Sequence, residues 1–177
     1  MIALIDDNVA ILQQGVQLLR RLSSEQYNRK FPVCFNSSVG GHIRHNFDHT
    51  LNFVNGWPEG FVDYDARQRN PRVETDPEAA AQSIEACIDR LGVLKAHDLE
   101  NPVRVKMDSG AAQESDCWSQ STVRRELQFL ISHTVHHYAL IATLCALMDV
   151  AVTSDFGVAP STLRHQHSQV PSPAKQA

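Results

Sequence analysis

The sequence predicts an all-α protein, a four-helix bundle with a long crossover and a short β-hairpin between the third and fourth helices. Apolar residues recur at helical spacing in four segments, and prolines, glycines and capping residues separate these segments. The chain has 177 residues, of which 42% are hydrophobic and 20% charged, a composition typical of one globular domain. We expect this domain over residues 1–167 and a loose, proline-containing tail over 168–177.

The first two helices are bounded by clear stop signals. Residues 7–27 carry apolar side chains at helical spacing, and Pro32 prevents that helix from continuing. A second helix is expected over 38–55, because two serines precede it as N-caps and Gly56-Trp57-Pro58 ends it. The polar residues 57–75 then predict a long loop.

A third helix begins at Thr75-Asp76-Pro77-Glu78, a capping box with proline in the first turn, and is expected to end between Leu94 and His97. Apolar and polar residues alternate over 103–107, which predicts a strand. A turn at 108–110 and a partner strand at Cys117-Trp118 complete the predicted hairpin.

The fourth helix has the strongest pattern and is expected over 121–149, followed by a short helical turn at 161–167. Four helices with one long connection between the third and fourth favour the bundle over other all-α arrangements.

Charge and composition exclude several classes of protein. The net charge of −4 gives no electrostatic reason to expect nucleic acid or an anionic membrane as partner. The longest apolar run, 139–147, is too short to span a bilayer, and the N-terminus lacks the basic start of a secretory signal. The four cysteines form no Cys-x-x-Cys pair, so we expect neither a zinc ribbon nor a disulfide framework. A cytoplasmic protein is expected.

Histidine is the unusual residue, because six of the nine fall in two short clusters. In the fourth helix, His133 and His137 lie in the middle of an apolar stripe about 80° wide. A spacing of four residues places the two imidazoles one above the other, where both can bind one metal ion. Burying two histidines is costly unless each finds a partner, so the pattern favours a metal site over two core histidines bonded to carbonyls.

Glu126 lies one heptad before His133 and has two interpretations. Its carboxylate can hydrogen-bond a ligand imidazole and fix the tautomer, or it can be a solvated residue near the helix start.

The second cluster, His42, His45 and His49, occupies one narrow stripe of the second helix. The apolar stripe of that helix is centred elsewhere, so a metal site and a solvated polar face both stay open. Helical geometry alone places His42 and His49 nearer the core than His45.

Two segments resemble a known family, the DinB/YfiT-like superfamily. They are Ser38-Val39-Gly40-Gly41-His42-Ile43-Arg44-His45 and, much later, His133-Thr134-Val135-His136-His137-Tyr138. The resemblance implies a four-helix bundle whose metal site takes one histidine from the second helix and a His-x-x-x-His pair from the last. By position after the Ser-Val start, it implies His45, His133 and His137 as the ligands, where geometry alone would prefer His49 or His42 to His45. Family members include thiol-dependent transferases and isomerases.

Three imidazoles on one divalent ion leave coordination positions for water or substrate. Zinc, nickel or iron suits such ligands. We therefore expect a metal-dependent hydrolase or thiol transferase acting on a small molecule that can be a thiol, with Asp48 or Glu126 as candidate base. A non-catalytic metal-binding or ligand-binding module, a metal-free scaffold and a homodimer stay open. A hemerythrin-like dinuclear bundle is disfavoured, because the sequence has no Glu-x-x-His pair.

Overall fold

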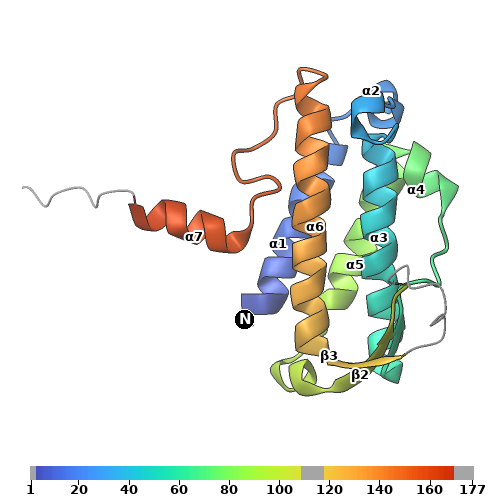
Figure 1. Cartoon of the computed structure of the whole chain (residues 1–177), viewed down its shortest axis with the longest axis vertical. Helices are drawn as coiled ribbons and strands as arrows, with labels where there is room; N and C mark the ends of the chain where they lie inside the picture. The colour runs from blue at the N-terminus through green and yellow to red at the C-terminus, as the bar shows by residue number, and fades with distance from the viewer. Residues whose placement is uncertain (1–2, 109–117, 170–177) are drawn as a thin grey trace, which may run out of the picture.

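The computed structural model describes residues 3–108 and 118–169 and confirms the predicted bundle. Four long helices run side by side (Figure 1): α1 (Ala3–Leu19), α3 (Val39–Gly56), α5 (Pro77–Leu91) and α6 (Val123–Ala146). α1 and α3 each pack against both α5 and α6, so one continuous apolar core fills the space between the four helices.

Three short helices lie outside this frame. They are α2 (Ser24–Asn28), α4 (Pro71–Thr75) and α7 (Pro160–Gln169), the last of which projects sideways from the bundle (Figure 1). Single 3-10 turns lie at Pro32–Cys34, Trp57–Glu59 and Ala96–Glu100. α7 extends the short helical turn predicted at 161–167, and residues 170–177 of the predicted tail lie outside the described residues.

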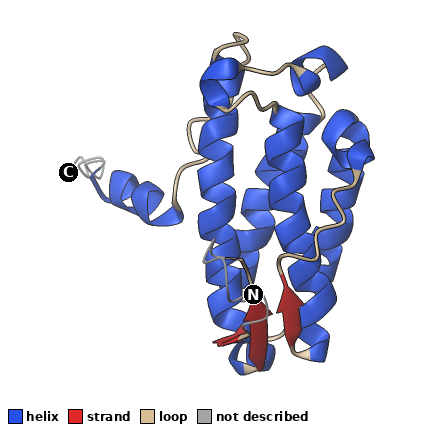
Figure 2. Ribbon diagram, turned by 45° about the vertical axis from the view of Figure 1, so that its right-hand side comes forward, coloured by secondary structure: helices blue, strands red, loops and turns tan. Residues whose placement is uncertain are grey.

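A small sheet closes one end of the bundle (Figure 2). Its strands are β1 (Phe61–Asp63), β2 (Pro102–Lys106) and β3 (Ser119–Thr122), in the order β1-β2-β3. β2 and β3 are the predicted antiparallel pair, although β3 begins just after the expected Cys117-Trp118. Residues 109–117, which include most of the predicted turn and Cys117, lie outside the described part of the chain.

The prediction of an unbroken loop over 57–75 was wrong, because β1 and α4 lie within it. β1 pairs in parallel with β2, with Val62 opposite Val105. A strand of three residues is too short to show the alternation on which strand prediction depends.

The helix starts follow their capping residues. The Ser38 side chain accepts from the Gly41 N–H and Thr122 accepts from the Arg125 N–H, which begins α3 and α6 near the predicted positions. The first predicted helix is divided in two, because Ser23 forms a reciprocal capping box with Gln26 and starts α2.

Among the described residues, α6 alone is long and apolar enough to meet the composition of a membrane span. In the structure it packs against α1 and α3 as a core helix and carries the fully buried Glu126. Core packing accounts for its apolar character, which is compatible with a soluble protein.

Candidate metal centre

Two neighbouring helices bring the two histidine clusters together in the interior. α3 supplies His42, His45 and His49, whose spacings of three and four residues keep them on one side of that helix. α6 supplies His133 and His137 from its apolar face. The α3 cluster therefore faces α6, with His42 and His49 buried and His45 half-buried, so it is not a solvated polar face, and metal binding stays a prediction.

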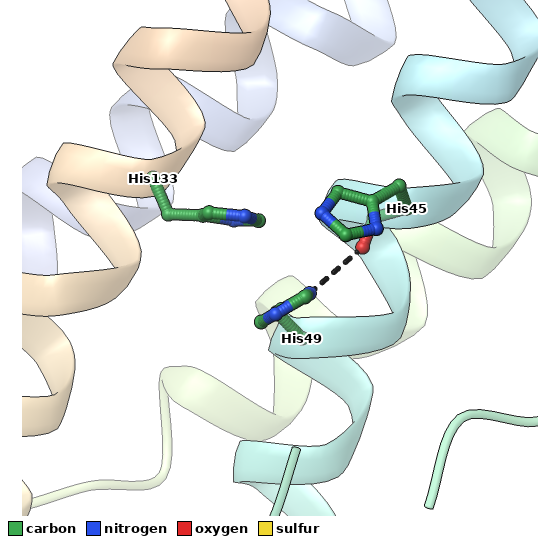
Figure 3. A group of neighbouring side chains, drawn as sticks. All are labelled: His45, His49 and His133. Carbon is green, nitrogen blue, oxygen red and sulfur yellow. Dashed lines mark hydrogen bonds between the residues drawn. The ribbon is translucent and has the colours of Figure 1, made fainter. Parts of the chain in front are cut away.

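Among the described residues, His45, His49 and His133 form a group of three potential ligands (Figure 3). One ring nitrogen from each lies within 4.8 Å of the others. The ring centroids of His49 and His133 are 4.1 Å apart, and that of His45 lies 4.7 Å from His49 and 5.1 Å from His133. Three imidazoles from two helices thus converge on one point.

His137 borders this group. Its ring centroid lies 4.6 Å from that of His133 and 4.7 Å from that of His45. The structure therefore brings the three predicted ligands His45, His133 and His137 together and adds His49 beside them. Whether His49 or His137 completes the ligand set stays a prediction.

Hydrogen bonds fix the protonation of two imidazoles in the form that binds metal. Nδ1 of His49 donates to the carbonyl oxygen of His45 at 3.0 Å. Nδ1 of His133 lies 3.2 Å from Oδ1 of Asn46, which also accepts from the Thr134 hydroxyl at 3.1 Å. Because Nδ1 carries the proton in both rings, their Nε2 lone pairs are available for an ion.

Burial keeps the cluster neutral. Desolvation, with added repulsion between neighbouring imidazoles, lowers the pKa of His45 to about 4, that of His133 to about 2 and that of His137 to about 3. Burial likewise lowers the pKa of His42 and His49. Near neutral pH no proton competes with a metal ion for these nitrogens.

The donor set fits a divalent transition metal. His45, His49 and His133 offer imidazole nitrogens and no carboxylate. Such a set of ligands suits zinc, nickel or iron better than magnesium or calcium. Ligands on two packed helices are also held in place by the core, so little ordering is needed for binding.

The two carboxylates proposed from the sequence have other partners. Glu126 is fully buried and accepts hydrogen bonds from Tyr64, Ser121 and Arg125, so it is neither solvated nor bonded to an imidazole among the described residues. The Tyr64 ring, whose hydroxyl donates to Glu126, stacks on His49 with centroids 5.4 Å apart. Asp48 is also buried and accepts from Arg44 at 3.0 Å.

Sequence reasoning missed four residues around the histidines. Asn46 orients His133, Tyr64 stacks on His49, and Arg67 places Nη1 3.1 Å from Nδ1 of His45. Sγ of Cys34 lies 3.6 Å from Nε2 of His42, whose Nδ1 lies 3.2 Å from Nδ1 of His137. Only Asn46 left a signal in the sequence, as a polar residue beside His45 on a packed helix. Cys34, Tyr64 and Arg67 lie outside the long helices, where no periodicity marks an inward-facing side chain.

Known proteins resemble this chain in fold and in sequence. The crystal structure of YjoA, a DinB-like protein from Bacillus subtilis, superposes with a TM-score of 0.64 at 18% identity, over 88% of this chain and 98% of YjoA. A protein of the fungus Rhizopus delemar named FK506-binding protein 5 is 33% identical over 108 residues. That match covers 61% of this chain and 28% of the fungal protein, so the chain corresponds to little more than a quarter of that relative.

The family model of the DinB superfamily matches residues 12–141, which include the C-terminal part of α1, all of α3 and α5, and the histidines of α6. That match covers well over half of the chain and includes both histidine clusters. The chain belongs to the DinB superfamily.

Proposed function

We propose that this protein binds one divalent transition-metal ion between α3 and α6 and acts as a metal-dependent hydrolase or thiol transferase on a small molecule. The observation that supports the proposal is the group of ring nitrogens of His45, His49 and His133, all within 4.8 Å of one another. Three neutral imidazoles are typical of catalytic sites, where an ion keeps a position for water or substrate.

A bound divalent ion would lower the pKa of a water or thiol on it, which supplies a nucleophile near neutral pH. Hydrogen bonds to surrounding groups keep two of the imidazoles in the tautomer that can bind a metal ion. Asn46 keeps the proton of His133 on Nδ1, and the His45 carbonyl does the same for His49. Tyr64 and Phe129 flank the His49 and His133 rings and shield them from solvent.

Elemental analysis of untagged protein tests the metal, and a matched pair of histidine variants tests its location. We expect about one ion per chain in the wild type, none in His133→Ala, and an unchanged content in His136→Ala, because His136 is exposed on the same helix. A metal-free wild type, or full occupancy in His133→Ala, would refute the proposal.

Turnover then separates the enzyme from a binding module. Metal-loaded protein is assayed on ester and on thiol-acceptor substrates, with His133→Ala as the inactive reference. One ion without turnover on either class would indicate a module that captures a ligand, and two ions per chain would indicate a dinuclear site. The proposal includes a cytoplasmic location and no nucleic-acid or membrane partner, in keeping with the net charge of −4. A homodimer is also proposed, and sizing by light scattering tests it.

A further inference from the structure

Arg67 brings a positive charge to the edge of the histidine cluster. It lies in the connection between β1 and α4, is half-buried, and directs Nη1 to Nδ1 of His45 at 3.1 Å. Its Nε is buried and has no hydrogen-bond partner. No carboxylate of the described residues forms an ion pair with this guanidinium. A buried guanidinium N–H without an acceptor is costly, so the position calls for an anionic partner.

The neighbouring carboxylates do not supply that partner. Asp48 pairs with Arg44 through Oδ2, and its buried Oδ1 has no hydrogen-bond partner. Glu126 accepts from Arg125, Tyr64 and Ser121. The group of three histidines itself contributes no negative charge. With a divalent ion bound, the site would therefore combine the charge of the ion with that of Arg67, and no carboxylate of the described residues forms an ion pair with Arg67.

The hydrogen bond between Arg67 and His45 would have to break before His45 could bind an ion. A guanidinium only donates, so Nδ1 of His45 accepts and the proton of the neutral ring lies on Nε2. If an ion takes Nδ1, it displaces Arg67 directly. If it takes Nε2, the proton moves to Nδ1 and Arg67 loses its acceptor. In both cases metal binding frees the guanidinium beside the ion.

We propose that Arg67 is the anion-binding residue of this site, and that it binds the carboxylate or phosphate group of a small anionic substrate next to the bound metal. This inference rests on the proposed function and narrows its substrate to oxyanions. The planar guanidinium fits both groups, because each presents two oxygens to its N–H fork.

The test uses the full-length protein loaded with zinc and dialysed, with acetate as the carboxylate probe and methylphosphonate as the phosphate-like probe. Calorimetry measures the affinity for each probe, and competition with a chromophoric chelator measures the affinity for zinc. Arg67→Gln should weaken binding of the preferred probe about tenfold or more, in line with a lost charge-assisted hydrogen bond. The same variant should bind zinc more tightly, because a competing cation is gone from His45. Arg69→Gln, an exposed arginine in the same connection, is the matched control and should change neither.

The two affinities distinguish the possible results. A merely structural Arg67 would lower zinc affinity, probe affinity and melting temperature together, and that outcome overturns the inference. Equal probe binding by wild type and Arg67→Gln, or no probe binding by the zinc-loaded wild type, overturns it as well while leaving the proposed function intact. Failure of the wild type to take up zinc overturns both.

Discussion

Replacing Asn46 by alanine removes the group that orients His133. Asn46 is 3% exposed, and its Oδ1 accepts from both the His133 ring and the Thr134 hydroxyl. The change leaves the buried Thr134 hydroxyl and the half-buried His133 ring without their acceptor, and an unpaired buried group costs about 1–3 kcal/mol of folding stability. It also releases the His133 tautomer, and loss of such an outer partner lowers metal affinity about 10–100-fold. Zinc affinity is measured by chelator competition at pH 7.5 and stability by urea unfolding.

Asn52→Ala provides the matched control. Asn52 lies on the same helix, is 9% exposed, and donates to the carbonyl of Asp63 at 2.8 Å and not to a histidine. It should lose comparable stability and keep its zinc affinity. If the two variants lost zinc affinity equally, or if Asn46→Ala bound zinc like the wild type, the orienting role of Asn46 would be wrong.

Three further predictions concern the ligand set, acid sensitivity and core packing. Chelator competition on His49→Ala and His137→Ala identifies the third ligand: the variant with the larger loss names it, and similar large losses would favour a dinuclear site. Burial lowers the pKa values of the cluster below the ordinary value of about 6.5. The ion-free protein should therefore lose folding stability as pH falls below about 6.5, because the unfolded chain binds protons that the buried imidazoles do not bind. Between pH 7.5 and 5.0 each such histidine should cost about 2 kcal/mol in urea unfolding, whereas a flat profile would contradict neutral burial. Gly15→Ala should destabilise the fold by about 3 kcal/mol, because its Cβ would lie 1.9 Å from Oη of Tyr138, and an unchanged melting temperature relative to Gly92→Ala would contradict this close packing.

Features set by neighbouring residues could be predicted from the sequence, whereas features set by contacts between distant segments could not. The α3 and α6 starts were predictable because Ser38 and Thr122 satisfy backbone N–H groups within three residues. The inward position of His133 and His137 followed from helical periodicity alone. β1 was not predictable, because its three residues are ordered by pairing with β2, some 40 residues later.

The metal ligands could likewise be predicted only in part. Periodicity places His42, His45 and His49 on one side of α3, but the rotation of α3 against α6 decides which ring meets His133. That rotation depends on packing across the whole core. The geometry preferred His49 and the family resemblance preferred His45, and the structure places both rings against His133.

The proposed site combines imidazoles on two packed helices with a guanidinium on a connection between elements. All five histidines lie on α3 and α6, whose shared core is packed whether or not an ion is present, so the ligands need little reorganisation to bind one. Arg67 instead lies in the connection between β1 and α4, where fewer packed elements restrain it. Under the proposal, an ion on His45 would replace the Arg67 hydrogen bond, and the connection that carries Arg67 could move without a shift of α3 or α6. Under the proposal, the imidazoles on the helices would hold the ion, and the guanidinium on the connection would bind the substrate anion beside it.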